Sequence, residues 1–404
     1  MGAHDSLPAA GGQGGGSRLH SAAVMNAYKD NGLLPEGLRD ELPPQAGFEA
    51  AVTEALMRTL DANGYARVKP PLVEFEETLL IGPGAALAGQ TFRLMDPVSQ
   101  RMMGVRPDMT LQIARIAATR LKHIARPARL SYAGQVLRVK GTQLRPEREI
   151  GQVGAELVGA ATPEADAEVV TVAAEALLGV GVRELSVDLV LPGLVPTMIA
   201  ALGLAAARGD ALRAALDRKD AAAVAAAAGP ERPLFAALMA ATGPVEAGLR
   251  QLRALGVAAA APAIAALERV VTSVGAAVPG LSLTVDACEY RGFEYHTGLA
   301  FTFFAKGVRG ELGRGGRYAL ESGEPATGFT VYMDSLARAL PAPAADRRLY
   351  VPAGTPRGQT AALRAQGWRT VGGFDAEADP DAEARRLGCS HVLRGGAATP
   401  LGGG

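Results

Sequence analysis

The stretch Arg148-Glu149-Ile150-Gly151-Gln152-Val153-Gly154-Ala155-Glu156-Leu157-Val158 is the part of the sequence that says most about the fold. The two-residue period of a strand divides its side chains between two faces: Arg148, Gln152, Gly154 and Glu156 on one, and Val153, Ala155 and Leu157 on the other. One face is polar and the other is typical of a core. Gly154 leaves a volume in which a small polar ligand could meet both the amide and the carboxylate. In isolation, a solvent-exposed strand face would be the commoner explanation.

The segments around this stretch predict an antiparallel sheet. A second strand is expected over 129–139, and a helix is expected to open at 106–110, with an apolar stripe that continues to Leu121. After the quoted strand, Thr162-Pro163-Glu164 supplies an N-cap, a first-turn proline and a first-turn acid for a helix to about Leu178. Strand, loop, strand and then helix indicates an α+β fold whose antiparallel sheet is flanked by helices.

Upstream, residues 1–18 are rich in glycine and serine, which predicts a disordered tail. Apolar residues then recur at helical spacing from Phe48 to Leu60, and the predicted helix ends at Asn63-Gly64. A strand is expected over 65–73, and its Pro70 and Pro71 belong at an edge or an interface because proline has no N–H donor. The first part of the sheet domain is placed at 19–191.

Downstream, the composition changes twice. Residues 192–280 are rich in alanine and predict a helical insertion, after which strand patterns at 281–289 and 295–304 open the second part of the sheet domain, 281–340. The glycine-rich stretch 313–318 lacks the lysine and hydroxyl pair of a phosphate loop, so a tight turn is expected there. Alternating strands and helices past Pro341 predict a small α/β domain at 341–404.

Composition excludes several classes of protein. The 404 residues hold 41 Lys and Arg against 41 Asp and Glu, which disfavours a nucleic-acid partner. Two distant cysteines, Cys288 and Cys389, fit a reducing cytoplasm, and no apolar run was found to approach the roughly 20 residues that span a bilayer. Cys389 and His391 have no second pair nearby, so a zinc site is not expected.

Several polar residues could gather around one amino acid. Carboxylates and an arginine could hold its ammonium and carboxylate ends, and the candidates are Asp108, Thr110, Arg138, Gln152 and Glu156. Taken singly, Asp108 would more often be an N-cap and Arg138 a surface residue. In the segment 290–301 the strand period points Tyr295 and His296 to opposite faces, so one of the two can reach a pocket. His296 taken alone would more often be a structural histidine.

In their order and spacing, these segments resemble the class II histidyl-tRNA synthetase family over roughly residues 34–340. The helix at 48–62 with Pro70 is similar to the first class II motif, residues 106–110 to the family's Arg-Pro-Glu-Gly-Thr, Arg138 to the second motif's arginine, and 291–296 to the histidine-specific Arg-Gly-Leu-Asp-Tyr-Tyr. The resemblance implies histidine contacts at Asp108, Thr110, Arg138, Gln152, Glu156, Arg291, Tyr295 and His296.

The departures from that family are equally informative. Ser335 stands where the third motif has its ATP-clamping arginine, Lys140 replaces the second motif's glutamate, and the tail after Pro341 is about half as long as the family's anticodon-binding domain. Arg338, one helical turn past Ser335, could restore the arginine only through a register shift. Loss of a positioned phosphate clamp should cost adenylation several kcal/mol.

A retained amino-acid pocket with a lost ATP clamp and tRNA domain resembles the family of ATP phosphoribosyltransferase regulatory subunits. The resemblance implies a chain without catalytic residues, cofactor or metal that binds histidine for feedback control. It also implies a homodimer that assembles with the short-form catalytic subunit, the enzyme of the first step of histidine biosynthesis. The alternatives are an active histidyl-tRNA synthetase-like adenylating enzyme, or a scaffold whose pocket binds nothing.

Overall fold

The computed structural model describes residues 33–80, 82–142, 145–290, 292–293, 295–342 and 347–402. Of the expected features, the tail at 1–18 and Arg291 lie outside the described residues. The chain divides into two compact units, Met1–Pro341 and Ala342–Gly404. The predicted helical insertion forms part of the first unit.

The main sheet contains nine strands among the described residues, in the order β1-β5-β6-β12-β11-β10-β7-β9-β8. In that order their bounds are Ala66–Arg67, Ala128–Leu137, Glu149–Val158, Pro325–Tyr332, Gly313–Ala319, His296–Ala305, Leu185–Val190, Ser282–Asp286 and Gly243–Pro244. Neighbouring strands from β5 to β7 are antiparallel, whereas β1–β5 and β7–β9 are parallel pairs. Strands from both parts of the predicted sheet domain thus alternate in one sheet, because β12, β11 and β10 lie between β6 and β7.

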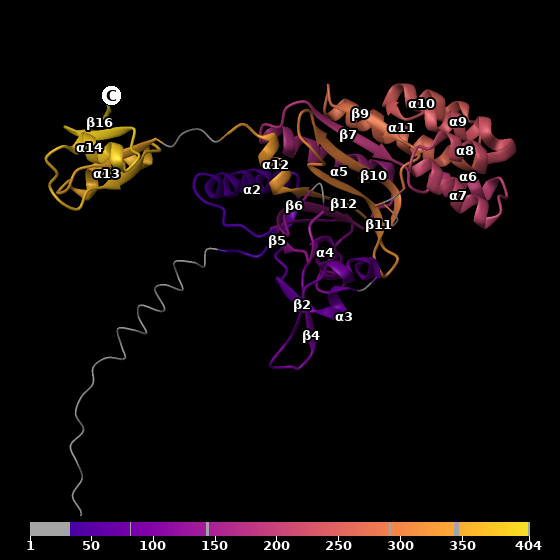
Figure 1. Ribbon diagram of the computed structural model, residues 1–404, viewed down its shortest axis with the longest axis horizontal. Helices are drawn as coiled ribbons and strands as arrows, with labels where there is room; N and C mark the ends of the chain where they lie inside the picture. The colour runs from indigo at the N-terminus through magenta and orange to yellow at the C-terminus, as the bar shows by residue number, and fades with distance from the viewer. Residues whose placement is uncertain are drawn as a thin grey trace, which may run out of the picture. The chain divides into compact units, whose positions relative to one another are not determined.

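Helices cover the two faces of this sheet unequally (Figure 1). On one face α2 (Gln45–Ala62), α5 (Pro163–Gly179) and α11 (Ala261–Ala277) share the largest core cluster with Val153, Ala155 and Leu157 of β6. The short α4 (Thr110–Ala118) packs in a second cluster with Ile150 of β6. The alternation expected for residues 148–158 is therefore present, but both faces of β6 are buried. The idea of a solvent-exposed strand face is wrong.

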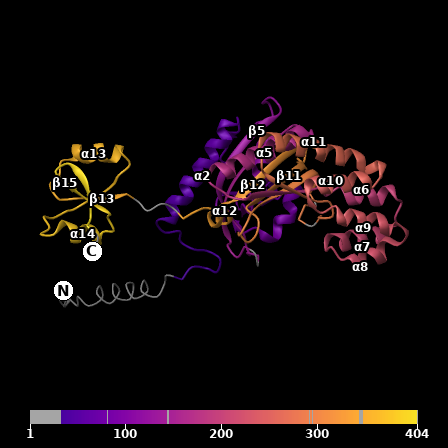
Figure 2. The same ribbon diagram turned by 90° about the horizontal axis from the view of Figure 1, so that it is seen from above.

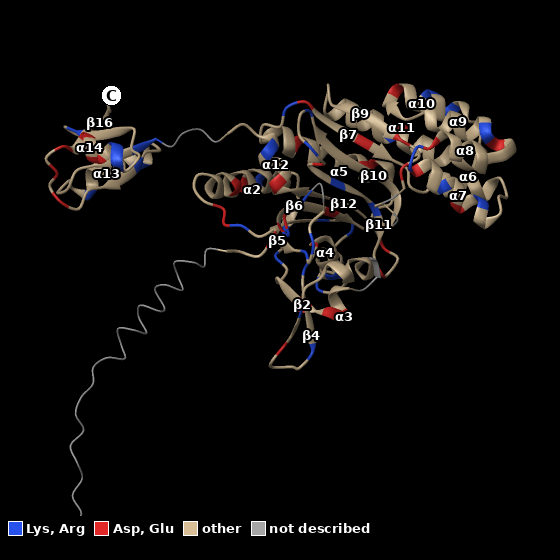
Figure 3. Cartoon of the chain, viewed as in Figure 1, with Lys and Arg blue, Asp and Glu red and all other residues tan. Residues whose placement is uncertain are grey.

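Helices fill the insertion between β7 and β9 (Figure 2). They are α6 (Leu194–Ala201), α7 (Ala206–Asp217), α8 (Ala221–Ala228), α9 (Arg232–Ala240), α10 (Val245–Ala254) and α11, with 3-10 turns η2 (Gly229–Glu231) and η3 (Ala258–Ala260). Figure 3 shows α6 and α8 without charged residues, as alanine-rich helices of this composition should be.

One helical stretch, Ala258–Ala277, is long and apolar enough by length and composition to cross a membrane, which inspection of the sequence had missed. Its buried side chains Ile264, Leu267, Val270 and Val274 join the main core cluster. Near its middle Glu268 pairs with Arg253, and Arg269 lies 3.4 Å from Glu164. These contacts are those of a helix that packs one face against the core and exposes the other.

Two expectations about strands fail. A single strand at 65–73 is replaced by β1 and by β2 (Val73–Phe75), which belongs to a separate three-stranded sheet with β4 (Met102–Val105) and β3 (Arg93–Met95). The break lies at Pro70 and Pro71, whose carbonyls accept hydrogen bonds from Arg106 and Gln112. The glycine-rich stretch at 313–318 is also no turn, because it forms β11 inside the main sheet.

The remaining elements of the first unit are α3 (Glu76–Leu79), the 3-10 helix η1 (Gly82–Gln90) and α12 (Met333–Ala339). The second unit is a small α/β fold with a sheet ordered β14-β13-β15-β16. Its elements along the chain are β13 (Arg348–Val351), α13 (Arg357–Ala365), β14 (Arg369–Gly372), α14 (Pro380–Arg386), β15 (His391–Arg394) and β16 (Ala397–Pro400). The first three strands pair in parallel, as the alternating pattern predicted, and β16 adds an antiparallel edge.

Candidate functional site

A cavity of about 660 Å³ opens on the α4 side of the main sheet. Its walls come from segments far apart in the sequence: the start of α4, the ends of β5 and β10, and the middle of β6, β11 and β12. Six of the eight predicted contacts line it, namely Asp108, Thr110, Arg138, Glu156, Tyr295 and His296. Gln152 lies behind the wall, and Arg291 lies outside the described residues.

Asp108 is a wall residue that is held in place by its neighbours. One carboxylate oxygen accepts the Thr110 backbone N–H at 2.9 Å, and the other accepts Gln152 Nε2 at 2.8 Å. The Arg138 guanidinium lies 4.0 Å from that second oxygen. Asp108 therefore holds the turn that leads into α4, whose N-cap is Met109, and lines the cavity at the same time. Gln152, 1% exposed, positions Asp108 and cannot be reached from the cavity.

Glu156 is the most deeply buried acid in the cavity wall, with 1% of its surface exposed. Its partners are hydroxyl groups: Tyr318 donates to Oε2 at 3.0 Å and Tyr132 donates to Oε1 at 3.4 Å. Burial raises the pKa of the Glu156 carboxyl to about 8. Gly328 on β12 makes room for this side chain, because a Cβ there would collide with the carboxylate. Glu156 is thus held ready for a group that would favour its charged form.

The volume over Gly154 is not open, contrary to expectation. A Cβ at Gly154 would collide with the Tyr132 hydroxyl and the Phe329 carbonyl, and the Tyr132 hydroxyl also contacts Thr330 Oγ1 at 2.8 Å. The sequence could not reveal this, because Tyr132 reaches the spot from the neighbouring strand β5. Glu156 and Gln152 consequently do not share one ligand space.

Tyr295 and His296 both line the cavity, so the expectation that only one of them could reach it is wrong. Tyr295 precedes β10 and is 46% exposed, and its ring lies 4.0 Å, centroid to centroid, from that of His296. Burial lowers the pKa of His296 to about 3, so the ring is neutral at physiological pH. Its buried Nδ1 has no hydrogen-bond partner among the described residues.

Sequence reasoning missed several cavity residues. Arg314, Gly316 and Tyr318 alternate along β11 and all line the cavity. This two-residue period was present in the sequence but was hidden by treating 313–318 as a turn. Arg145, Arg309 and Glu311 also line the cavity from loops, where no period could have pointed to them.

Ser335, at the place of the absent arginine, lines the cavity and is 1% exposed. Its hydroxyl oxygen accepts hydrogen bonds from Arg338 Nη2 at 3.0 Å and from Arg145 Nη2 at 3.4 Å. Of these two arginines, Arg145 lines the cavity. A guanidinium therefore does stand beside Ser335, but it comes from the loop between β5 and β6.

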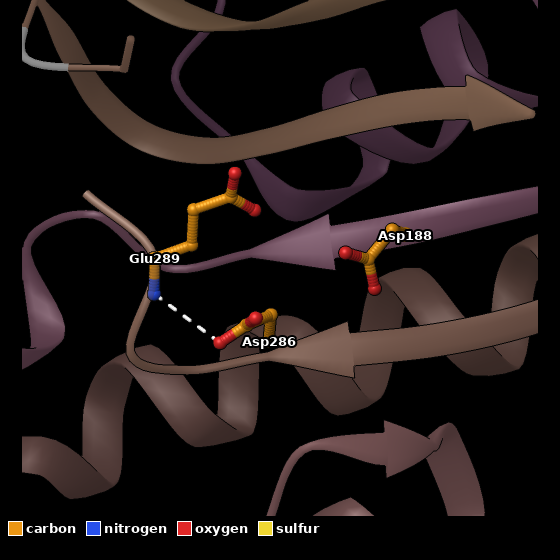
Figure 4. Close-up of side chains that lie close together, drawn as sticks. All are labelled: Asp188, Asp286 and Glu289. Atoms are coloured by element: carbon orange, nitrogen blue, oxygen red, sulfur yellow. Dashed lines mark hydrogen bonds between the residues drawn. The ribbon is translucent and has the colours of Figure 1, made fainter. Parts of the chain in front are cut away.

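Outside the cavity, Asp188, Asp286 and Glu289 gather where β7 and β9 end (Figure 4). Their carboxylate oxygens lie within 4.8 Å of one another, a spacing that could hold a cation. The chain already supplies partners: Lys219 pairs with Asp286, Asp286 accepts the Cys288 and Glu289 backbone N–H groups, and Thr284 donates to Asp188 at 2.6 Å. Lys219 takes the role that a metal would have in this cluster.

The histidyl-tRNA synthetase family model matches residues 37–336. The chain is 58% identical over 370 residues to the ATP phosphoribosyltransferase regulatory subunit of Paramagnetospirillum magneticum, which covers 91% of this chain and 98% of that protein. The regulatory subunit of Rhodospirillum centenum is 58% identical over 366 residues, covering 90% and 95%.

Solved structures show the same relationship. A Bacillus halodurans protein described as an ATP phosphoribosyltransferase regulatory subunit/histidyl-tRNA synthetase superposes with a TM-score of 0.77 and 26% identity, covering 90% of this chain and 98% of that one. Histidyl-tRNA synthetase from Nostoc, at 17% identity and a TM-score of 0.76, shares the fold. The chain therefore belongs to the ATP phosphoribosyltransferase regulatory subunits, a branch of the histidyl-tRNA synthetase family.

Proposed function

We propose that this chain binds histidine in the cavity and carries its feedback signal to a short-form catalytic subunit, without catalysing the reaction itself. The observation that supports this best is Glu156, a buried carboxyl that accepts hydrogen bonds from the Tyr318 and Tyr132 hydroxyls and faces a cavity lined by Asp108 and Arg138. An ammonium or imidazolium group would form a charge-assisted hydrogen bond with such a carboxylate.

The proposed ligand suits both charges of the wall. Glu156 and Asp108 receive the N–H groups of histidine, and Arg138 lies close enough to Asp108 to meet the ligand's carboxylate. The neutral His296 ring beside Tyr295 offers an aromatic surface to the ligand's imidazole. Binding should favour ionised Glu156, so histidine affinity should rise with pH between about 6.5 and 8.

Glu156→Gln tests the proposal because it keeps the shape of the side chain and removes its charge. A charge-assisted hydrogen bond stabilises the bound state by roughly 1.5–3 kcal/mol. Its loss should lower histidine affinity, measured by calorimetry, about tenfold to a hundredfold. The reconstituted transferase should then need correspondingly more histidine for inhibition, while size exclusion shows an intact complex.

The matched control is Glu175→Gln, which removes a carboxylate from the exposed side of α5 and should leave histidine affinity unchanged. Equal affinity in wild type and Glu156→Gln would mean that histidine acts elsewhere, for instance on the catalytic subunit.

In the proposed assembly the chain is a cytoplasmic homodimer joined through α2 and β1. Light scattering that shows a monomer at micromolar concentration would contradict the dimer.

A second candidate function, amino-acid adenylation, is favoured by one observation: Arg145 stands beside Ser335 in the cavity. Against it, the Arg145 guanidinium already has partners in the chain: its Nε lies 3.5 Å from Asp334 Oδ2, and it stacks on the Tyr332 ring. We expect no histidine-dependent pyrophosphate exchange above background. Exchange that disappears in Arg145→Gln would establish adenylation instead.

A further inference from the structure

A second hollow of the first unit shares no lining residue with the cavity proposed for histidine. It encloses about 510 Å³, which lies within the roughly 300–1,000 Å³ of pockets for small ligands. Its walls come from the segment before α2, from α2 itself, from β5, from the start of β6 and from α12. We call this hollow the acidic groove, because six of its lining residues are acids: Glu41, Glu49, Glu54, Glu147, Glu149 and Asp334.

The acids of the groove outnumber the cations in its wall. Among the described lining residues the one cation is Arg39, and its guanidinium pairs with Glu41. No described cation lies within 4.0 Å of the carboxylates of Glu49 or Glu149. The groove therefore presents a negative surface on which at least two carboxylates have no ion pair within the described part of the chain.

Asp334 is the buried acid of the groove, with a side chain that is 5% exposed. Its Oδ1 has no hydrogen-bond partner among the described residues, and Glu147 Oε2 is in the same state. Arg145 and Arg338 reach only the other oxygen, Oδ2, each at 3.5 Å, which is longer than a good hydrogen bond. A buried carboxylate oxygen without a donor is costly, so its place in the wall of a hollow points to a ligand that donates N–H groups.

Glu49 extends from α2 over the start of β6. A Cβ at Gly151 of β6 would lie 3.0 Å from Glu49 Oε1 and 3.0 Å from Met333 Cβ, so this carboxylate lies near the residue that precedes Asp334. Burial, together with the neighbouring carboxylates of Glu41 and Asp334, raises the pKa of Glu49. A cation among these acids would relieve their mutual repulsion.

Arginines outside the wall reduce this charge without cancelling it. Arg67 lies 3.0 Å from Glu54, Arg338 lies 3.8 Å from Glu147, and Arg145 makes the contact with Asp334. With Arg39, these make four cations against the six acids of the groove. The surplus of negative charge supports a cationic ligand.

The spacing of the carboxylates favours an organic cation over a metal ion. Among the described residues, three acids with ligand atoms within 4.8 Å of one another occur only at Asp188, Asp286 and Glu289, outside the groove. A divalent metal needs several oxygens around one point, whereas an extended amine donates N–H groups at separate points. The groove therefore suits a ligand with several ammonium groups along a chain.

We propose that the acidic groove binds a linear organic polyamine, whose ammonium groups donate to Asp334, Glu147 and Glu49. Each contact is a charge-assisted hydrogen bond, and the one to Asp334 satisfies the buried Oδ1. The site is independent of the proposed function, because the groove contains none of the expected histidine contacts.

Calorimetric titration of spermidine into the full chain tests the proposal. Wild type should bind spermidine, and the affinity should fall as salt is raised. Asp334→Asn keeps the shape of the side chain and removes its charge, so the affinity should fall about tenfold to a hundredfold. Glu49→Gln should weaken binding less, because Glu49 is only half-buried, and this variant remains informative if Asp334→Asn does not fold.

The matched control is Asp61→Asn, which removes an exposed acid at the end of α2 outside the groove and should change nothing. Putrescine, a shorter diamine, should bind more weakly than spermidine. Glu49→Gln should also leave histidine affinity unchanged, since Glu49 does not line the cavity.

Three results would overturn the proposal. The first is no spermidine binding at millimolar concentration, or equal weakening in Asp61→Asn. The second is binding of Mg²⁺ that Asp334→Asn abolishes while spermidine fails to bind, which would make the groove a metal site. The third is a loss of dimer in light scattering of Glu49→Gln without any spermidine binding to wild type, which would assign the groove to a basic side chain of a second copy.

Discussion

Two buried acids of the main sheet, Asp286 and Glu156, differ in the groups that contact their carboxylates. At the insertion, Asp286 is met by Lys219, Thr242 and two backbone N–H groups, so its charge is answered by the chain itself. In the cavity, the partners of Glu156 within the described part of the chain are the hydroxyl groups of Tyr318 and Tyr132. Both side chains are buried, but of the two only Asp286 is paired with a cation from the residues that the structure describes. The comparison indicates that Asp286 serves the fold and that Glu156 serves a ligand.

Asp286→Ala should have the largest effect on stability. It leaves the Cys288 and Glu289 N–H groups and Lys219 without their acceptor, which should cost about 2–4 kcal/mol. The cost is below that of breaking a fully buried pair because the Lys219 side chain is 51% exposed. Urea denaturation measures it, with Asp210→Ala in an exposed pair as the control, expected to change stability by about 0–1 kcal/mol. A loss equal to that control would contradict the assignment.

Glu156→Gln should act in the opposite direction on the free protein. An acid whose folded pKa is raised from 4.5 to about 8 makes the native state bind more protons than the unfolded state, so its contribution to stability falls as pH rises through that window. The variant should therefore gain on wild type as the pH rises from 5 to 8, by up to about 1.4 kcal/mol for each pH unit, and the gain should level off above pH 8. Unfolding curves across this range measure the difference. A difference that does not vary with pH would show that Glu156 is ionised in the free protein.

The smallest effects come from removing one hydroxyl partner at each site. Thr284→Val removes the donor to Asp188, and Tyr318→Phe removes the donor to Glu156. Each should cost about 0.5–1.5 kcal/mol of stability in denaturation experiments. Only Tyr318→Phe should alter histidine affinity in calorimetry, since only Glu156 faces the cavity. An equal change of affinity in Thr284→Val would remove the distinction between the two sites.

The acids Asp188, Asp286 and Glu289 include a residue, Glu289, that lies close along the chain to the segment with Tyr295 and His296. Asp217 of α7 accepts the Tyr290 N–H at 3.0 Å, and Tyr295 follows five residues later in the cavity wall. Burial and the neighbouring carboxylates raise the pKa of Glu289 to about 7. The helical insertion thus holds the backbone at Tyr290, a contact that its alanine-rich composition did not suggest.

Local patterns predicted much of the fold. The helical spacing from Phe48 to Leu60 predicted α2, and Thr162 caps α5 as expected by accepting the Ala165 N–H. The alternation in residues 148–158 predicted β6 and the faces of its side chains. Such signals suffice because period, caps and proline act within a few residues of one another. Resemblance to a known family predicted eight contacts, and six of these residues line one cavity in the structure.

What the sequence alone could not determine depends on contacts between strands that are distant along the chain. Tyr132 fills the space over Gly154, Gly328 makes room for Glu156, and Arg145 reaches Ser335 across 190 residues. No local period records which side chain a neighbouring strand brings to a given point. The sequence by itself determined helices such as α2 and α5 and strand β6 with its two faces, but it did not determine the break at Pro70 and Pro71 or strand β11. Only the tertiary structure decided which of those polar groups partner one another and which are left facing the cavity.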